Sequence, residues 1–317
     1  MRKLISIVVP VYNEEGNVRN LYTRVNEALE PISADYDWEF VFTDNHSEDK
    51  TFDILEELAR KDQRVRAFRF AKNVGFQRSI LTGYRLARGE AAMQIDCDLQ
   101  DPPELFREFV KHWEQGYQVV YGVRRQRQEH FAINMLRSLF YRLIDKISTE
   151  KLPHGAGDFR LVDRRILELL DDIDDQEPYL RGFIASAGFN QIGIEYDRAA
   201  REVGESKFSF SDLANLAIDG ITHHSTVPLR MFTYLGMMIS LAATGYATYA
   251  VITWFLDTQS TLPRGWSSLA VGIFFLGGVQ LMGIGILGEY IARTYNQVKK
   301  RPTAVIEKQI DAKSDKS

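Results

Sequence analysis

Hydrophobic and polar positions divide the chain into two parts. Up to about residue 207, short apolar runs rich in β-branched and aromatic residues alternate with amphipathic segments. The apolar runs predict strands at 4–11, 38–43, 65–70, 91–95 and 119–123. The amphipathic segments predict helices at about 15–30, 49–62, 76–88 and 103–115. This alternation indicates an α/β fold with a mostly parallel sheet that carries helices on both faces.

Two long uncharged stretches follow, at residues 231–256 and 265–288. At about 1.5 Å per helical residue, each can cross a hydrocarbon core about 30 Å thick. The polar turn between them contains Asp257 and Arg264. We predict a hairpin of two transmembrane helices, and a pair of buried core helices in a soluble protein is the alternative. Basic residues outside the hairpin outnumber those in its turn, so we expect both termini on the cytoplasmic side.

These patterns predict an order of domains along the chain. They are a cytoplasmic α/β domain at 1–207, a juxtamembrane amphipathic helix at 208–229, the hairpin region at 230–290 and a polar cytoplasmic tail at 291–317. A further segment at 131–147 has one apolar face and is expected to lie at the membrane interface. An ordinary core helix explains either amphipathic segment equally well. We expect the tail after Thr303 to be disordered because it is polar.

Composition and missing motifs exclude several classes of protein. The net charge is −4 over 317 residues and no basic cluster stands out, so nucleic-acid binding is not indicated. The single cysteine, Cys97, cannot support a disulfide framework and suits a reducing compartment. Neither a GxGxxG motif after the first predicted strand nor a GxxxxGK[ST] motif is present. The sequence therefore argues against a Rossmann dehydrogenase and a P-loop NTPase.

Acidic side chains follow the fourth predicted strand. Asp96 and Asp98 are two residues apart, and Asp101 comes shortly after them. Ligands of parallel sheets bind at the carboxyl ends of the strands. Carboxylates this close repel each other unless a cation joins them, and Mg²⁺ or Mn²⁺ prefers such oxygen ligands together with phosphate oxygens. The spacing favours a divalent metal site on Asp98 and Asp96, and a solvated acidic turn is the alternative.

Several longer motifs occur in a fixed order along the chain. They are IVVPVYNEE, FTDNHSEDKT, AKNVGFQRSILTGYRLARGE, QIDCDLQDPPE, YGVRRQRQE, GAGDFRLVDR and REVGESKFS. In these motifs and in the paired apolar stretches, essentially the whole chain resembles family 2 glycosyltransferases. Within that family it is similar to the polyprenyl-phosphate sugar transferases, the bacterial relatives of dolichyl-phosphate mannose synthase.

The resemblance implies a fold and a reaction. The fold would be GT-A, which binds a nucleotide sugar and a Mg²⁺ or Mn²⁺ ion. The reaction would be inverting transfer of one sugar, with UDP-glucose as the expected donor, to a polyprenyl phosphate such as undecaprenyl phosphate. It would take place at the cytoplasmic face of a bacterial plasma membrane.

The same resemblance implies the residues of the donor site. Those expected at the nucleotide base and ribose are Pro10, Tyr12, Asn13, Glu15 and Asp44. Asp96 is expected near the ribose and diphosphate, Asp98 at the metal, and Gln100 and Asp101 close to the sugar. The family's usual Asp-Asp-Gly-Ser motif reads Asp44-Asn45-His46-Ser47 here, which leaves the base contacts of residue 45 open.

Cations and one further acid complete the predicted site. Transfer releases a nucleoside diphosphate, whose negative charge must be stabilised. The candidates are Arg124 and Arg127 after the fifth strand, and Arg201 and Lys207 in REVGESK; a surface cation is the alternative for each. By resemblance, Asp158 in GAGDFR is the candidate base. A phosphate monoester with a second pKa near ~6 is largely ionised at neutral pH, so Asp158 could orient the acceptor instead. A helix cap or a salt-bridge partner of Arg160 is the alternative for Asp158.

Two alternative functions differ from this hypothesis in recognisable ways. A processive polysaccharide synthase would carry a QxxRW segment and more membrane helices, and the sequence has neither. An inactive membrane scaffold would have no need for the DxD carboxylates, which are present. Small residues in the second uncharged stretch would let helices approach closely, and we expect a homo-oligomer. They are Gly277, Gly278, Gly283 and Gly285.

Overall fold

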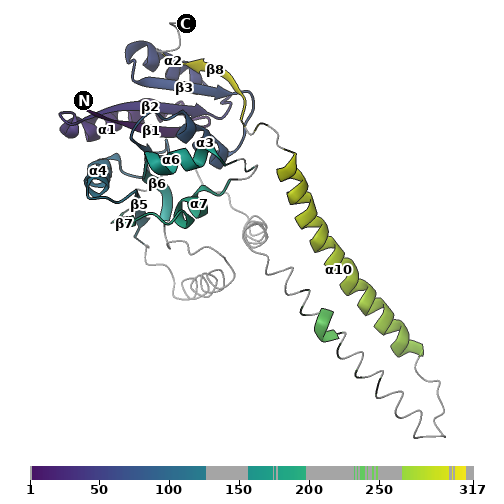
Figure 1. The fold of residues 1–317 in the computed structure, drawn as a ribbon. Helices are drawn as coiled ribbons and strands as arrows, with labels where there is room; N and C mark the ends of the chain where they lie inside the picture. The colour runs from purple at the N-terminus through teal and green to yellow at the C-terminus, as the bar shows by residue number, and fades with distance from the viewer. Residues whose placement is uncertain are drawn as a thin grey trace, which may run out of the picture. The chain divides into compact units, whose positions relative to one another are not determined.

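The structure is a computed structural model that describes residues 2–125, 156–173, 178–197, 266–299 and 304–311, together with a few isolated positions. The chain forms two compact units. The first consists of residues 1–139, 150–206 and 300–317, and the second of residues 140–149 and 207–299. The first unit contains the strands and helices of an α/β domain (Figure 1).

One sheet of eight strands forms the centre of the first unit, in the order β7-β5-β6-β4-β1-β2-β3-β8. The strands are β1 Lys3–Val11, β2 Tyr36–Asp44, β3 Val65–Phe70, β4 Ala91–Gln94, β5 Val119–Arg124, β6 Ala156–Asp163, β7 Gln191–Tyr196 and β8 Ile306–Ile310. Strand β1 pairs in parallel with β2 and β4, and β2 pairs in parallel with β3. Strand β6 runs antiparallel to β4 and β5. The predicted α/β fold with a mostly parallel sheet is therefore confirmed, and each of the five predicted strands is present.

Helices cover both faces of this sheet, as the sequence predicts. They are α1 Val18–Leu29, α2 Thr51–Lys61, α3 Phe76–Leu86, α4 Phe106–Glu114, α6 Arg164–Asp171 and α7 Leu180–Ser186, with short 3₁₀ turns at Glu30–Ile32 and Pro103–Leu105. Helices α1, α2 and α4 pack on one face around Phe40, Phe42 and Phe106. Helices α3, α6 and α7 pack on the other face around Tyr84 and Ile166. Each such side chain stabilises the fold by roughly 1.5–3 kcal/mol through its burial.

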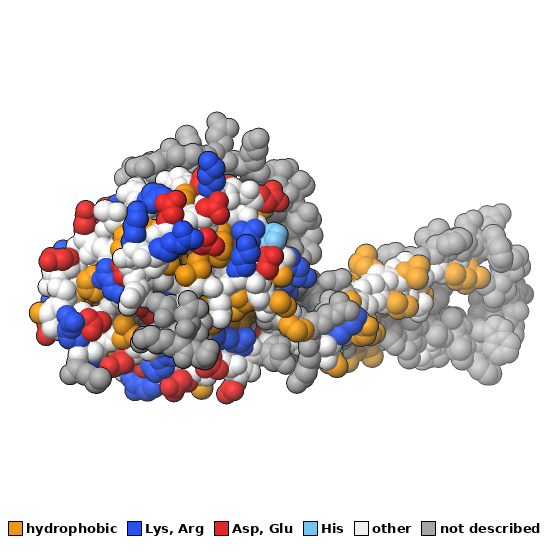
Figure 2. All heavy atoms as spheres, turned by 90° about the horizontal axis from the view of Figure 1, so that it is seen from above, with side chains coloured by type: hydrophobic (Ala, Val, Ile, Leu, Met, Phe, Trp, Pro, Cys, Tyr) orange, Lys and Arg blue, Asp and Glu red, His pale blue; other side chains and the backbone are white. Residues whose placement is uncertain are grey.

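The second unit contains helix α10, Trp266–Val298, which includes the second uncharged stretch. Large apolar side chains of this helix are exposed, among them Ile273 at 61 %, Leu281 at 71 % and Ile284 at 65 %. Figure 2 shows hydrophobic side chains gathered along α10, whereas acidic and basic side chains are interspersed on the visible face of the first unit. Among the residues that the structure describes, no helix is long and apolar enough to cross a membrane. Most of the first expected span, 231–256, lies outside the described residues.

The expected disorder after Thr303 is wrong for residues 306–310, which form β8 at the edge of the sheet. This strand pairs antiparallel with β3, and the N–H of Ala71 donates to the carbonyl of Val305 at 2.9 Å. Beyond the strand, the Asp311 carboxylate accepts hydrogen bonds from Arg66 Nε at 3.0 Å and from Arg88 Nη2 at 2.6 Å. Residues 306–311 have a defined structure because they have partners in the sheet.

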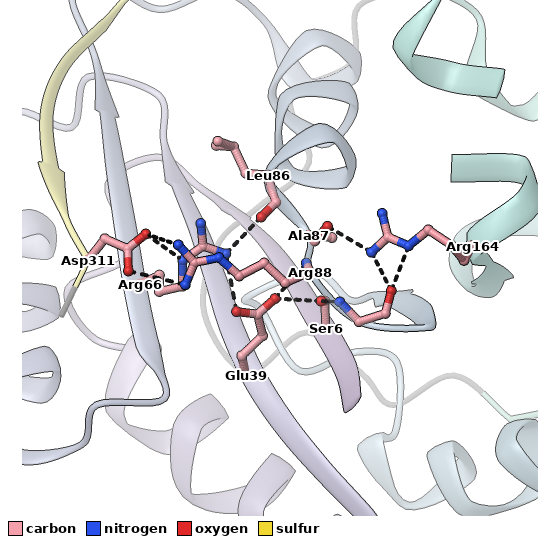
Figure 3. A network of polar contacts seen from close by, with 9 residues as sticks. Ser6, Glu39, Arg66, Leu86, Ala87, Arg88, Arg164 and Asp311 are labelled. Atoms are coloured by element: carbon pink, nitrogen blue, oxygen red, sulfur yellow. Dashed lines mark hydrogen bonds and ion pairs between the residues drawn. The ribbon is translucent and has the colours of Figure 1, made fainter. Parts of the chain in front are cut away.

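A buried polar network surrounds Asp311 (Figure 3). The Arg66 guanidinium also donates to Glu39 at 3.1 Å and to the carbonyl of Leu86 at 2.7 Å. Glu39 in turn accepts from the Ser6 hydroxyl at 2.7 Å. The side chains of Arg66, Glu39 and Asp311 are only 5 %, 7 % and 8 % exposed. Charges this deeply buried are tolerated because each has an opposite charge and hydrogen bonds.

Candidate active site

A cavity of about 430 Å³ opens where β1, β2 and β4 end. The residues that line it are Pro10, Val11, Tyr12, Glu14, Asn45, Asn73, Gly75, Phe76, Asp96, Cys97 and Asp98. Four of these residues are predicted from the sequence as donor-site residues, and the fold brings them together. They are Pro10, Tyr12, Asp96 and Asp98. The ring of Tyr12 is 44 % exposed and is available to pack against a planar group.

The backbone is strained in the loops beside this cavity. In the described part of the chain, three residues other than glycine have positive φ, namely Asn13 at 54°, His46 at 64° and Leu99 at 56°. They follow β1, β2 and β4 respectively. Such conformations are uncommon for residues with a side chain and gather at functional sites, where the surrounding structure enforces them. The loops after β1, β2 and β4 are therefore held in demanding conformations.

Hydrogen bonds join the loop after β1 to the loop after β2. The N–H of Asn13 donates to the hydroxyl of Ser47 at 3.0 Å, and the N–H of Glu48 donates to Asn13 Oδ1 at 2.8 Å. The Glu15 carboxylate accepts from the N–H of Lys50 at 3.1 Å. Asn13 and Glu15 thus fix the wall of the cavity, and their expected contact with a nucleotide stays a prediction.

Asp44 is fully buried and does not line the cavity. Its carboxylate accepts from the N–H of Ser47 at 3.1 Å and from Arg69 Nη1 at 3.1 Å. Burial raises the pKa of Asp44, while the hydrogen bonds from Ser47 and the charge of Arg69 oppose that shift. The next residue, Asn45, reaches the cavity lining instead. Asp44 therefore holds Ser47 and Arg69 in place beside the cavity and does not line the cavity itself.

Asp96 lies among other carboxylates at the end of β4. Its pKa is raised to about 7, first because burial penalises the charged form and then because Asp101, Asp158 and Asp98 are near. Asp96 Oδ1 accepts a hydrogen bond from Gln94 Nε2 at 2.8 Å. The predicted acids of the site therefore lie within electrostatic range of one another. Among the described residues, no three acidic, histidine or cysteine side chains are arranged to hold a metal ion unaided.

The turn after β4 meets the end of β5 through hydrogen bonds of Asp101 and Arg124. The N–H of Gln100 donates to Asp98 Oδ1 at 3.2 Å, which shapes the turn between the acids. Asp101 is 1 % exposed and accepts hydrogen bonds from the Tyr196 hydroxyl and, at 3.5 Å, from Arg124 Nη2. Arg124 Nε also donates to the Tyr196 hydroxyl at 3.2 Å. The Arg124 side chain remains 33 % exposed, so part of it can meet a ligand.

Asp158 forms a buried ion pair with a residue of α7. Arg181, from α7, donates to it through Nε at 2.8 Å and Nη2 at 2.5 Å, a bidentate arrangement. Gln77 Nε2 donates at 3.3 Å and Arg160 lies 3.6 Å away. Burial alone would raise the pKa of Asp158, but hydrogen bonds and charge from Arg181 lower it. The lowered pKa makes this carboxylate a weak base and Arg181 holds it in place, which favours a role in orientation over one as a base.

Several residues of this site were not predicted from the sequence. Arg181 lies in the short helix α7, after an acidic stretch, and nothing in the sequence around it marks it as the partner of Asp158. The sequence offers Arg160 only in the alternative interpretation of Asp158 as its salt-bridge partner, and the two lie 3.6 Å apart. Gln77 belongs to a motif noted for other reasons, and nothing in that motif marks it as a contact of Asp158. The predicted Arg127, Arg201 and Lys207 lie outside the described residues, as do the amphipathic segments at 131–147 and 208–229.

Comparison with known proteins identifies the family. The model of Glycosyl transferase family 2 matches residues 6–170, which include the cavity and its acids. The chain belongs to glycosyl transferase family 2. The GT-A fold expected from the sequence is thereby confirmed, and the protein is a glycosyltransferase. A second model, the GtrB C-terminal hairpin, matches residues 227–294.

Relatives of this glycosyltransferase extend over nearly its whole length. The bactoprenol glucosyl transferase of Shigella phage SfII is 38 % identical over 305 residues, which cover 96 % of this chain and 97 % of the relative. A prophage bactoprenol glucosyl transferase homolog of Escherichia coli is 37 % identical over 96 % of this chain and 98 % of its own. One similar solved structure is that of the mannosyltransferase PcManGT from Pyrobaculum calidifontis in complex with GDP-Man and Mn²⁺. It matches with a TM-score of 0.47 and 16 % sequence identity, and the match covers 95 % of this chain and 89 % of that one.

Proposed function

We propose that this glycosyltransferase transfers one glucose from UDP-glucose to a polyprenyl phosphate at the cytoplasmic face of the membrane. The observation that carries the proposal is the cavity at the strand ends, where Tyr12 and Asn45 lie near Asp96 and Asp98. A planar base needs an aromatic surface and a ribose needs amide groups, which Tyr12 and Asn45 offer. The diphosphate would be bound through a divalent ion on the acidic side chains of Asp96 and Asp98. The names of the full-length relatives support glucose and a bactoprenol acceptor.

A hairpin in the membrane, at 231–256 and 265–288, is part of the proposal. It is supported by the lack of charge in both stretches and by the match to the GtrB C-terminal hairpin. The exposed apolar side chains of α10 are a second argument, because contiguous apolar surfaces on a helix mark contact with lipid or protein. We keep the expectation that both termini are cytoplasmic and that the chain forms a homo-oligomer.

Asp98, together with Asp96, is the proposed ligand set of a Mg²⁺ or Mn²⁺ ion. The residues fit such an ion because burial, and then the nearby charges of Asp101, Asp158 and Asp98, raise the pKa of Asp96, so that a cation would stabilise the ionised carboxylates. Magnesium sites in nucleotide enzymes use one or two carboxylates and take the remaining oxygens from phosphate and water. When bound, the ion supplies charge neutralisation for the diphosphate leaving group.

In the proposed reaction a phosphate oxygen of the lipid attacks the anomeric carbon of the sugar. A new carbon–oxygen bond forms on the face opposite the departing UDP, so the configuration inverts. Asp158, fixed by Arg181, orients the acceptor, while Arg124 stabilises negative charge on phosphate oxygens. We assign the same electrostatic role to Arg201 and Lys207, which remain predictions from the sequence.

One experiment tests the proposal. Purified protein is incubated with radiolabelled UDP-glucose, Mg²⁺ and undecaprenyl phosphate, and the lipid is extracted. Label in a monosaccharide lipid supports the proposal, label in a polymer would indicate a processive synthase, and no incorporation would indicate a scaffold. Asp98→Asn should reduce incorporation at least about 100-fold, since it removes a proposed metal ligand. Asp37→Asn is the matched control, because Asp37 is 50 % exposed at the opposite end of its strand.

A further inference from the structure

Strand β8 contacts the loop region of the candidate donor site through Glu307. Its pairing with β3 is irregular here, because Phe70 lies opposite Ile306 whereas Arg69 lies opposite Lys308. Glu307 is therefore the extra residue of a β-bulge. Bulges redirect a side chain and are common next to active sites. The Glu307 carboxylate lies 3.6 Å from Arg69 Nε and 3.7 Å from His46 Nδ1.

Arg69 connects Glu307 to the buried Asp44. Its Nη1 donates to Asp44 at 3.1 Å, and its Nη2 donates to the carbonyl of Ser47 at 3.0 Å. The guanidinium also lies over the ring of Phe52, 5.5 Å from its centre. The side chain is only 18 % exposed. A planar guanidinium with a carboxylate on each side has one favourable orientation. In this orientation Nη1 donates to Asp44 at the end of β2 and Nη2 donates to Ser47 in the loop that follows.

From Ser47 the contacts continue to the wall of the cavity. The Ser47 hydroxyl donates to Asp44 and accepts from the N–H of Asn13, the residue that follows the cavity-lining Tyr12. A continuous series of polar contacts therefore runs from the C-terminal strand, through Arg69, to two strained loops at the cavity. Asn13 and His46, both with positive φ, lie along this series.

The other end of β8 is fixed independently. Asp311 is buried against Arg66 and Arg88 in the network of Figure 3, which holds the strand in one register along β3. Because a one-residue slip of an edge strand would move every side chain to the other face, this anchor determines where Glu307 points.

We infer that β8 is part of the donor site and that Glu307 is a positioning residue for nucleotide binding. Through Arg69 it holds Asp44 and Ser47 in the arrangement that shapes the nucleotide end of the cavity. The ligand class is a nucleoside diphosphate, and in this respect the inference rests on the proposed function. Residues after the proposed hairpin thereby contribute to a cavity whose lining comes from residues 10–98.

The test is calorimetric titration of the full-length protein in detergent with UDP and Mg²⁺. Glu307→Gln should raise the dissociation constant of UDP about threefold, the effect expected for a partly exposed ion pair, and leave the melting temperature unchanged. Lys308→Gln, on the same strand, is the matched control and should leave UDP affinity unchanged. In transfer assays, Glu307→Gln should raise KM for the donor and leave kcat unchanged, because its role is positioning.

A double-mutant comparison separates this role from a general effect on the strand. In an Arg69→Gln background, Glu307→Gln should have no further effect on UDP affinity, since the two residues act through one contact. Equal affinity of wild type and Glu307→Gln would overturn the inference, as would a threefold loss that persists without Arg69. Failure of the wild type to bind UDP would instead overturn the donor assignment, and the inference with it. Glu307→Asp provides the same comparison if Glu307→Gln does not fold.

Discussion

Replacement of Arg181 by methionine tests the ion pair at Asp158. The substitution keeps most of the apolar stem and removes both donors to the carboxylate. Asp158 is 7 % exposed, so water cannot readily replace the lost hydrogen bonds. After the change it would keep Arg160 at 3.6 Å and Gln77 at 3.3 Å.

The expected magnitude follows from burial on the two sides of the pair. Removing one partner of a fully buried pair costs about 3–5 kcal/mol, and an exposed pair contributes at most about 1 kcal/mol. Arg181 is 40 % exposed and Asp158 keeps two partners, so we expect a loss of about 2 kcal/mol. For a domain of this size, that loss lowers the melting temperature by about 4–8 °C.

Thermal unfolding of both proteins at several pH values measures the effect. Although burial alone would raise the pKa of Asp158, Arg181 lowers it. The pair therefore stabilises the protein above the unfolded-state pKa of about 4, and this stabilisation is lost as the pH falls through the lower folded-state pKa. The difference between wild type and Arg181→Met should be complete at pH 7 and should shrink below about pH 4.

Arg125→Met is the matched control for Arg181→Met. Arg125 also lies between two carboxylate groups, those of Glu195 and Asp197, but these side chains are 67 % and 79 % exposed. Its loss should change stability by less than about 0.5 kcal/mol. If Arg181→Met is no more destabilising than Arg125→Met, our account of the buried pair is refuted.

Three further predictions concern packing and the metal. A methyl group at Gly83 would overlap Val8 of β1, so Gly83→Ala should reduce the free energy of unfolding by about 1–3 kcal/mol in urea titrations. At Gly122 a methyl group would lie 2.6 Å from the ring of Tyr196, so Gly122→Ala should displace the Tyr196 hydroxyl from Asp101. We expect kcat/KM for sugar transfer to fall about tenfold. An unchanged kcat/KM would argue against a role for this contact. Removal of divalent ions with EDTA should abolish sugar transfer, and Mg²⁺ or Mn²⁺ should restore it; transfer in excess EDTA would contradict the proposed metal site.

Strand ends and the family resemblance together predicted several residues that line the cavity. The run at 65–70 matches the bounds of β3, and the acids after β4 line the cavity with Tyr12. This works because parallel strands in register end at a common edge, so residues far apart in the chain meet there. A buried parallel strand is also nearly all apolar and stands out in a sequence.

The strands and contacts that were missed depend on pairing between distant charges. Strand β6 carries Asp158 and Arg160 within its apolar run, and β8 contains mostly polar residues. Such segments look irregular or disordered when they are read alone. Their order comes from partners such as Arg181 and Arg66, and neither propensity nor periodicity shows which charges will be brought together.

The position of β8 in the chain has a consequence for how the protein is made. During synthesis the edge of β3 emerges early, but residues 306–310, which pair with it, emerge only after the long intervening stretch of chain. Until then β3 presents unpaired backbone groups of the kind that recruit other chains. Contacts between such distant residues also form slowly. We therefore expect nascent chains that stall before residue 306 to associate with one another through β3. We also expect the protein to tolerate a C-terminal tag only when the tag is placed after an intact segment 306–311.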